Sequence, residues 1–490
     1  MITFWVIKVK TDMRIIYVKG IKSMCKNESN KQPETAAIIN LGCKVNKYEA
    51  DAMKDKLIAA GMVVVEPEDA ADIYIVNTCS VTNMAQKKSR QMLRRAKKRN
   101  PEAIVIAAGC YVNAEHDVLK GEDFVDIVVG NNCKKDIVDV IREYIDGRAG
   151  EDCYVEIGKT GEYEEMGSLS AAHLDHQRAY IKIQDGCNQF CSYCIIPYTR
   201  GRVRSRQPEH ILEEIRNLAR TGVKEFVLTG IHISSYGVDF KGNNMQYDSV
   251  MEEQEMTEAG NHTSGEKSAD ERTENLACMD LGRLVEQIAD IPEVERIRLG
   301  SLEPRIVTEE FLSRITKSNK ICPHFHLSLQ SACNATLKRM NRKYTIEEFA
   351  EKCRLLRQCF DRPAITTDVI VGFPGETEEE FAVTVEHLRQ LQLYEIHVFK
   401  YSPRSGTVAE RMPDQIPEEK KHERSEVLLE LTSRQKAAYE RSLAGMEDEV
   451  LIEESVDDSQ EEFTGHTKRY VKVSVHAKDD LVNRIVKYVY

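Results

Sequence analysis

The chain has 490 residues, of which 41% are hydrophobic and 30% are charged, and its formal net charge is −12. This hydrophobic fraction excludes a wholly disordered chain, and the length suggests about three domains. No stretch approaches the roughly 20 consecutive apolar residues that a membrane-spanning helix needs, which excludes an integral membrane protein.

The first segment, residues 1–35, is a leader that we expect to be poorly ordered. Its apolar stretch is interrupted by Lys8, Lys10 and Asp12, so it does not read as a secretory signal peptide. The chain contains fourteen cysteines. Without a signal peptide they indicate a cytoplasmic protein, in which grouped cysteines bind metals or take part in catalysis.

Residues 36–146 alternate between short β-branched runs and helix-compatible segments, which predicts a parallel α/β sheet domain. The expected strands are 36–42, 72–78, 103–109 and 126–130. Three of them are followed directly by Cys43, Cys79 and Cys110. Because the carboxyl ends of parallel strands meet at one edge, these three thiols could lie at one site. The alternative is three unrelated buried cysteines.

A basic helix is expected over residues 86–99, directly after Cys79. The candidates for contact with RNA phosphates are Lys87, Lys88, Arg94 and Arg95. The alternative is a solvated helix face without a partner.

A linker over residues 147–172 leads to a second alternating region, residues 173–417. Its six expected strands are 179–184, 224–230, 294–300, 323–329, 364–372 and 393–401. Six βα units predict an open, partial (βα)6 barrel. A polar stretch, 241–275, reads as a solvated insertion loop. A helical connection over 418–446 then leads to a small β-barrel over 447–490, with strands expected in EVLIEES, YVKVSVHA and LVNRIVKYVY.

Cys187, Cys191 and Cys194 form a C-x3-C-x2-C group after the first barrel strand. No fourth cysteine or histidine lies close in sequence, and the nearest histidines are His176 and His210. Three close thiolates suit a [4Fe–4S] cluster with one iron left open. A structural zinc is the alternative.

Other candidate residues flank this group. Arg200, Arg202, Arg204 and Arg206 alternate, so in an extended segment they would form one strip for RNA or for a substrate carboxylate. Gly372 and Gly375 lie at a strand-to-helix turn where the backbone can approach a ligand closely. In the tail, cations and one aromatic ring suit RNA contact, namely Lys468, Arg469, Tyr470 and Lys472.

The cysteine triplet in DGCNQFCSYCIIPYTRGR, at the mouth of a partial barrel, resembles the radical S-adenosylmethionine superfamily. The resemblance implies that the open iron chelates S-adenosylmethionine and that the sulfonium is cleaved to a 5′-deoxyadenosyl radical. It also implies positions that hold this cofactor, namely Thr229, Gly230, Ser328, Gln330, Gly372 and Gly375. Ordinary turn chemistry is the alternative for each.

The segments LGCKVNKYEAD, VNTCSVTNMAQKKSRQ and AAGCYVN resemble the N-terminal domain of methylthiotransferases, and the tail resembles the TRAM domain, an RNA-binding β-barrel. The resemblance implies a second [4Fe–4S] cluster on Cys43, Cys79 and Cys110. The segments IIPYTRGRVRSR, GSLEP, LSLQSACNATLKRMNRKYT and HVFKYSPRSGTVAERMP are similar to the MtaB-type branch.

The MtaB-type branch implies an enzyme that converts N6-threonylcarbamoyladenosine at position 37, in the anticodon loop of tRNA, to its 2-methylthio derivative. It also implies an electron donor such as flavodoxin or ferredoxin, an unidentified sulfur donor and no membrane partner. The alternatives are a methylthiotransferase for isopentenyl-adenosine or for a ribosomal protein, and a non-catalytic RNA-binding protein with zinc.

The acidic net charge is unevenly distributed. The insertion 241–275 holds nine acidic and three basic residues, and the stretch 151–171 holds six acidic residues and one basic residue. The basic residues gather instead at 86–99, 200–206 and 468–472. The distribution therefore favours an RNA partner, although the total does not.

Overall fold

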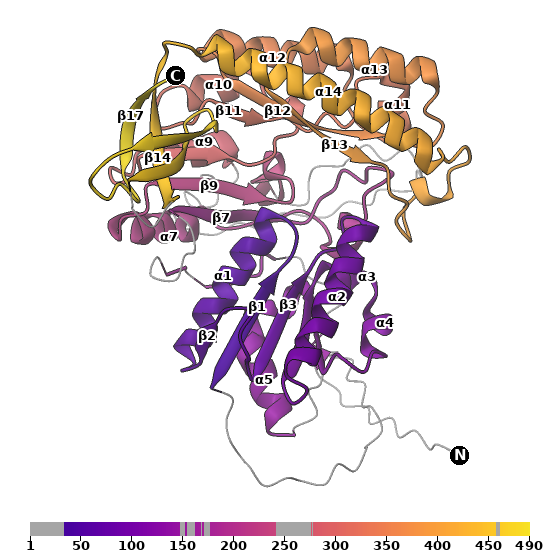
Figure 1. Cartoon of the computed structure of the whole chain (residues 1–490), viewed down its shortest axis with the longest axis vertical. Helices are drawn as coiled ribbons and strands as arrows, with labels where there is room; N and C mark the ends of the chain where they lie inside the picture. Colours follow the sequence, from indigo (N-terminus) through magenta and orange to yellow (C-terminus); the bar gives the residue numbers. More distant parts are fainter. Residues whose placement is uncertain are drawn as a thin grey trace, which may run out of the picture.

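The computed structural model of the chain describes residues 34–147, 152–153, 162–167, 169–170, 177–241, 276, 278–456 and 461–490. The described residues form an N-terminal α/β domain, a central open barrel and a C-terminal sheet (Figure 1). The leader 1–35 lies almost entirely outside the described residues, and so does the insertion 241–275 beyond Lys241. None of the helices in the described part of the chain has the length and apolar character needed to cross a bilayer.

The N-terminal domain is a parallel sheet with the strand order β2-β1-β3-β4-β5-β6, as its alternating pattern predicted. The strands are β1 (Thr35–Asn40), β2 (Val63–Val65), β3 (Ile73–Thr78), β4 (Ile104–Gly109), β5 (Ile127–Val129) and β6 (Asp152–Cys153). The helices are α1 (Lys44–Ala59), α2 (Asn83–Arg99), α3 (Cys110–Ala114), α4 (His116–Lys120), the 3-10 helix η1 (Asn131–Asp136) and α5 (Ile137–Ile145). Strand β6 falls within the expected linker, so the sheet extends past residue 146.

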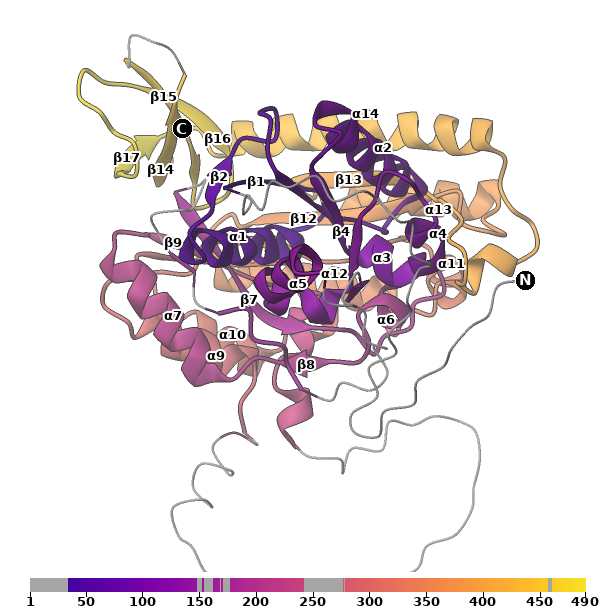
Figure 2. The ribbon, with the colours of Figure 1, turned by 90° about the horizontal axis from the view of Figure 1, so that it is seen from below.

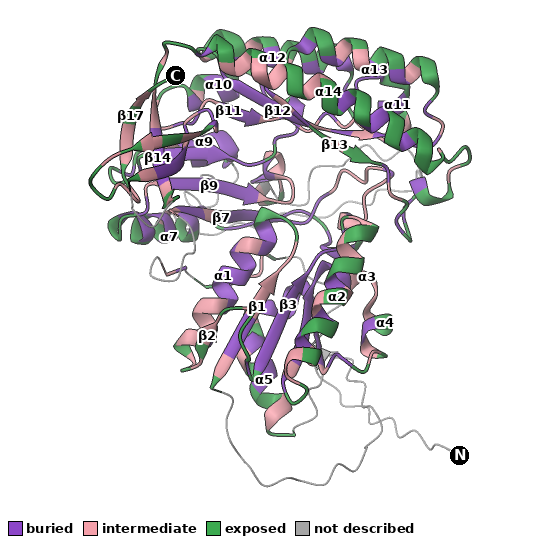
Figure 3. Ribbon diagram, in the orientation of Figure 1, coloured by how far each residue is buried: buried purple, intermediate pink, exposed green. Residues whose placement is uncertain are grey.

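Helices cover both faces of this sheet. Because consecutive residues of a strand point to opposite faces, each strand contributes side chains to two cores. Ile73 and Ile75 of β3 join the large core that contains α1 and α5, whereas Tyr74 and Val76 join a separate core with Leu93 of α2. The buried strands between the helices are visible in Figure 3. This double burial explains why the strands read as continuous apolar runs.

Six parallel strands make up the central barrel, which confirms the expected partial barrel. They are β7 (Arg178–Asp185), β9 (Glu225–Gly230), β10 (Arg296–Leu299), β11 (His324–His326), β12 (Ala364–Val371) and β13 (Glu395–Lys400). They form two sheets, β10-β9-β7-β8 and β11-β12-β13, where β8 (Arg204–Ser205) is antiparallel to β7. Isolated bridges, Ile297 to Ile321 and Leu302 to Leu327, join the two sheets. In the described residues β7 and β13 do not pair, so the barrel stays open.

Helices cover the outside of the barrel. They are α6 (Ile196–Thr199), α7 (Pro208–Arg220), α9 (Leu281–Ala289), α10 (Glu309–Ile315), α11 (Asn334–Arg339), α12 (Ile346–Cys359), α13 (Glu378–Leu391) and α14 (Glu418–Ser442). Capping boxes fix the first turns of two of them, Thr345 with Glu348 in α12 and Thr377 with Glu380 in α13. The N-terminal domain lies against the open side, with α1 beside β7 and α3 beside α6 (Figure 2).

The C-terminal sheet is antiparallel, with the order β16-β15-β14-β17. Its strands are β14 (Glu447–Ser455), β15 (Glu462–Thr467), β16 (Lys472–His476) and β17 (Ile485–Val489). The sequence did not predict β15, in which Gly465 lets the strand approach β14: a Cβ there would lie 2.0 Å from the Leu451 carbonyl oxygen. This sheet docks on the amino-terminal ends of the barrel strands, where Arg296 Nη1 donates to His466 O over 3.1 Å.

Candidate functional site

The three cysteines of the N-terminal domain lie at one edge of its sheet, as predicted. Cys43 precedes α1 after β1, Cys79 follows β3, and Cys110 begins α3 after β4; these strands are neighbours. Cys79 and Cys110 are buried, whereas Cys43 is exposed, although surrounding atoms still raise the pKa of its thiol by burial. Burial, with smaller contributions from the thiols of Cys110 and Cys43, raises the pKa of the Cys79 thiol to about 11. Each of these thiols therefore lies within the electrostatic reach of the others.

Gly42 lets the Cys43 loop approach Cys79. Its φ is +105°, and a Cβ at this position would lie 2.8 Å from Cys79 Sγ. A side chain larger than hydrogen would therefore collide with the thiol and strain the backbone. The glycine therefore lets the Cys43 loop lie directly against Cys79.

The second cysteine group follows β7 in a tight loop. Cys187 N donates to Gly201 O over 3.0 Å, and Gln189 N donates to Cys187 Sγ over 3.4 Å. Burial raises the pKa of Cys187 to about 11 and that of Cys194 to about 12, and Cys191 adds to both shifts. These thiols also face one another, but they form a group separate from the first.

One arginine contacts this group, and the sequence analysis did not single it out. Arg342 Nη1 lies 3.2 Å from Cys191 Sγ, and its Nη2 donates to Ser328 O over 3.1 Å. Arg342 is 151 positions from Cys191 along the chain, so no local spacing indicates this contact.

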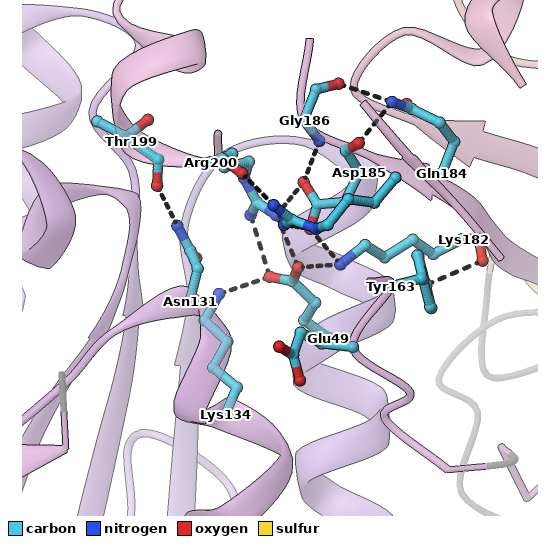
Figure 4. Close-up of polar contacts among 12 residues, drawn as sticks. Glu49, Asn131, Lys134, Tyr163, Lys182, Gln184, Asp185, Gly186, Thr199 and Arg200 are labelled. Atoms are coloured by element: carbon cyan, nitrogen blue, oxygen red, sulfur yellow. Dashed lines mark hydrogen bonds and ion pairs between the residues drawn. The ribbon is translucent and has the colours of Figure 1, made fainter. Parts of the chain in front are cut away.

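A second arginine, Arg200, contacts the first group. Its side chain is fully buried, and its Nε lies 3.1 Å from Cys110 Sγ. The other two nitrogens are held by Glu49, Asn46 and Asp185 (Figure 4). Arg200 thus joins a cysteine of the N-terminal domain to the end of β7.

The buried network around Arg200 carries more positive than negative charge. Glu49 accepts from Lys134, Lys182 and Arg200, and Asp185 lies within 4.0 Å of Lys182, Arg200 and Arg204. Burial opposes ionisation of Glu49, but these cations hold its pKa well below the usual value. Four cations thus face two carboxylates. Buried charge of this kind calls for a further anion nearby.

The thiol groups fit iron–sulfur clusters better than single zinc ions. A cluster ligated by three thiolates is an anion, and it would balance the excess of positive charge beside Cys110. Thiolates on one tetrahedral zinc ion lie roughly 3.8 Å apart, given a Zn–S distance of about 2.3 Å. Among the described residues, one set of three ligand-type side chains has its ligand atoms within 4.8 Å of one another: His326, Asp368 and His397. This set contains none of the cysteines.

The predicted cofactor-binding residues lie at the carboxyl ends of the barrel strands. Thr229 and Gly230 end β9, Ser328 and Gln330 follow β11, and Gln330 has a φ of +73°. At Gly372, after β12, the φ is +70°, and a Cβ would lie 2.3 Å from Lys421 Cγ. The close approach predicted there is therefore to α14. Gly375, with a φ of +72°, faces Arg339.

The expected strip of four arginines is wrong for three of its members. Arg200, Arg204 and Arg206 are buried, and Arg206 pairs with Glu165 and Glu214. Their side chains face carboxylates from distant parts of the chain, which alternation alone does not reveal. Arg202 is exposed, and its guanidinium lies 4.5 Å from the centre of the Phe190 ring.

The predicted RNA contacts of the tail are also wrong in part. Arg469 is buried and donates to Asp361 O over 2.8 Å and to Arg362 O over 3.1 Å, just before β12, and Tyr470 stacks on His324 and His466. Both residues therefore hold the C-terminal sheet on the barrel. Lys468 is half-buried and pairs with Glu449, whereas Lys472 is exposed.

The basic helix α2 presents Lys87, Lys88, Arg94 and Arg95 to solvent. Other cations of this helix are paired: Lys97 with Asp126 over 2.8 Å, and Arg90 with Glu122. Leu93 and Ala96 form its buried side. Among the residues that the structure describes, the only ion pair of these four cations is a 3.8 Å contact of Arg94 with Glu122.

Both the N-terminal domain and the barrel match known protein families. Residues 181–388 match the Radical SAM superfamily, and residues 35–130 match a family described as uncharacterized protein family UPF0004. The two matches cover the barrel and the N-terminal domain, each with one cysteine group.

Full-length relatives are similar as well. The chain is 38% identical to the threonylcarbamoyladenosine tRNA methylthiotransferase MtaB of Bacillus subtilis, over 92% of this chain and 93% of that protein. It is 36% identical to the MtaB protein of Aquifex aeolicus, over 85% and 92%. It is also 31% identical to the tRNA-2-methylthio-N(6)-dimethylallyladenosine synthase of Caldicellulosiruptor saccharolyticus, over 94% and 90%.

Proposed function

The chain belongs to the radical S-adenosylmethionine methylthiotransferase family, and from this premise we propose that it modifies N6-threonylcarbamoyladenosine at position 37 of tRNA to the 2-methylthio derivative. Enzymes of this family use S-adenosylmethionine and two [4Fe–4S] clusters. The observation that carries the proposal is the pair of three-thiol groups on two domains, joined by the Arg200 network. A non-catalytic zinc protein does not fit the family.

In this proposal the two cysteine groups hold clusters with different roles. In our proposal Cys187, Cys191 and Cys194 hold the cluster that binds S-adenosylmethionine, and Thr229, Gly230, Ser328 and Gln330 line the place of this cofactor. The chemistry that this pair supplies when bound is a radical able to remove hydrogen from an unactivated carbon. Arg342 orients Cys191 and shields its sulfur from water.

The second group lies where a sulfur-bearing cluster would meet the substrate. We assign Cys43, Cys79 and Cys110 as its ligands, and Gly42 lets the Cys43 loop lie close to Cys79. Cys43 is the exposed member, so this cluster would face the solvent-filled side from which a base can enter. An unpaired base of the anticodon loop can be turned out into such a site.

Polar groups in the barrel favour the threonylcarbamoyl substituent over isopentenyl. Ile365 and Val369 of β12 face the helices, so Asp368 faces the opposite, concave side. There His326 Nε2 lies 3.2 Å from Asp368 Oδ2, with the ring of His397 stacked on His326. Ionisable groups on this face suit a substituent with a carboxylate, a hydroxyl and a urea group. The relatives at 36–38% identity carry the same substrate in their names.

The remaining partners follow from the substrate. The exposed cations of α2 would contact tRNA phosphates, and Arg202 is positioned to meet either the RNA or the substrate carboxylate. A tRNA substrate implies a cytoplasmic enzyme. Reduction of the clusters requires an electron donor, for which flavodoxin or ferredoxin is our proposal.

Mass spectrometry of tRNA nucleosides from strains with and without the gene tests the proposal. We expect 2-methylthio-N6-threonylcarbamoyladenosine to disappear on deletion and to return on complementation. Complementation with Cys43→Ala should fail to restore it. Loss of the isopentenyl-adenosine derivative instead would identify the second candidate substrate, which the 31% identical relative supports.

A further inference from the structure

We propose that Arg200 is a positioning residue that sets the reduction potential of the cluster on Cys43, Cys79 and Cys110 and ties its ligand Cys110 to the loop of the barrel cysteines. This inference rests on the proposed function, because it assumes that these thiols hold a cluster. It concerns a residue that the sequence pattern placed on the RNA-binding surface. The structure instead puts its guanidinium against a thiol.

The guanidinium is held in one orientation. Its Nη1 donates to Glu49 Oε1 over 2.8 Å and to Asp185 Oδ2 over 3.0 Å, and its Nη2 donates to Asn46 Oδ1 over 2.9 Å. Only Nε then points at Cys110 Sγ, 3.1 Å away. Because the side chain is fully buried, no water can replace this contact.

The residues on each side of Arg200 complete a link between the two cysteine groups. Thr199 O accepts from Asn131 Nδ2 over 3.2 Å, and the same nitrogen lies 3.7 Å from Cys110 Sγ. Gly201 O accepts from Cys187 N over 3.0 Å. Residues 199–201 thus connect the two cysteine groups. Arg200 contacts Cys110 directly and Thr199 does so through Asn131, whereas Gly201 accepts from Cys187.

The direction of the effect follows from charge. Reduction adds an electron to the cluster, and both a hydrogen bond to a ligand sulfur and a nearby positive charge favour the more negative state. Arg200 supplies both, in a site where buried cations already outnumber carboxylates. Lysine would keep the charge, but its single ammonium cannot bond Asn46, Glu49, Asp185 and the sulfur in the same geometry.

The chain offers a matched control in Arg206. It is equally buried and bonds to Glu165 and Glu214, and within the described part of the chain its side chain bonds to no thiol. Arg206→Lys therefore shows how far the potential and the iron content change when a buried, paired arginine of the same segment is replaced. Arg200→Lys shows in addition the effect of losing the contact with Cys110.

The test uses full-length protein in which Cys187, Cys191 and Cys194 are replaced by alanine, so that only the N-terminal cluster remains. Its midpoint potential is measured by a redox titration followed by electron paramagnetic resonance, with iron content measured in parallel. For Arg200→Lys we expect the ratio of reduced to oxidised cluster at a fixed potential to fall at least tenfold, which corresponds to about 59 mV for one electron. Arg206→Lys should leave the potential unchanged.

Further variants test whether the effect is specific to the N-terminal cluster and replace Arg200→Lys if that variant does not bind iron. In protein lacking Cys43, Cys79 and Cys110, Arg200→Lys should not shift the barrel cluster. Should Arg200→Lys fail to hold iron, Asn131→Ala decides, because it removes the amide that joins Thr199 O, beside Arg200, to Cys110 Sγ and should lower the potential in the same direction. An unchanged potential in the variant that does hold iron overturns the inference. A parent protein that holds no iron would count against the proposed ligands rather than against Arg200.

Discussion

The ring of Tyr470, in the turn between β15 and β16, stacks on the ring of His324 at the start of β11, with the ring centres 4.9 Å apart. The same ring stacks on His466 and lies 4.7 Å from the guanidinium carbon of Arg298. Tyr470 therefore fastens the C-terminal sheet to the barrel. It is not available as a stacking surface for a base.

Tyr470→Ala should destabilise this junction. Loss of a large, mostly buried ring costs about 3 kcal/mol, and the stacking and cation–π contacts are lost with it. We expect a lower urea midpoint, with the C-terminal sheet unfolding first. Lys472→Ala, two residues on and exposed, is the control and should leave the midpoint unchanged. Equal midpoints for wild type and Tyr470→Ala would show that the stack contributes nothing.

The location of the cysteines could be predicted, because it depends on local patterns. Apolar β-branched runs identified the six parallel strands of the barrel and four strands of the N-terminal sheet, though not the short β2 and β6, and residues that follow neighbouring strands meet at one edge. The arginine contacts could not be predicted. Alternation placed Arg200 and Arg206 on one side of the chain but did not show that carboxylates 151 and 41 positions away cover that side. Strand β15 was missed because Gly465 and its polar neighbours read as a turn.

Acid should weaken the buried ion cluster under the barrel. Glu225 bonds to Arg298 over 2.7 Å and also faces Arg296 and Arg178. Burial opposes its charge, but these arginines lower its pKa to about 2. A lowered folded pKa means that the stabilisation is present above the unfolded value, near 4.5, and is lost as the pH falls toward 2.

The variant Glu225→Gln isolates this contribution. At neutral pH its free energy of unfolding should be lower than that of the wild type by roughly 3 kcal/mol, because three arginines lose the carboxylate that they share. Its urea midpoint should fall accordingly. The difference should shrink between about pH 4.5 and pH 2. Urea titrations across this range measure it, with the exposed Glu351→Gln as control. A difference that does not depend on pH would refute the assignment of this linkage to Glu225.

Iron content should follow the two cysteine groups independently. After anaerobic reconstitution we expect about eight irons per chain in wild type. Replacement of Cys187, Cys191 and Cys194 by alanine should leave about four, and so should replacement of Cys43, Cys79 and Cys110. Cys353→Ala, a buried cysteine that packs in the hydrophobic core, serves as control and should keep all eight. Zinc in place of iron would contradict the prediction.

Binding of tRNA should depend on salt through helix α2. Replacing the exposed Lys87, Lys88 and Arg95 by alanine removes up to three phosphate contacts. Each contact contributes about 0.7–0.9 to the slope of log affinity against log salt, so the slope should fall by roughly 2 to 3. Filter binding at several salt concentrations measures it. Alanine at Arg434 and Arg441 of α14 is the control; an equal loss there would indicate a general charge effect.

Arg202 should select the modified tRNA. It is the exposed member of the segment 200–206, and it rests over Phe190 within the loop of the barrel cysteines, so its guanidinium can meet the substrate carboxylate. A charge-assisted hydrogen bond contributes about 1.5–3 kcal/mol, and Arg202→Ala should therefore raise KM about 10- to 100-fold for tRNA with threonylcarbamoyladenosine. Steady-state kinetics with this tRNA and with tRNA that carries isopentenyl-adenosine measure the selectivity, and Arg220→Ala, exposed on α7, is the control. Because only the first substrate has a carboxylate, an equal rise in KM for both tRNAs would mean that Arg202 binds the RNA backbone instead.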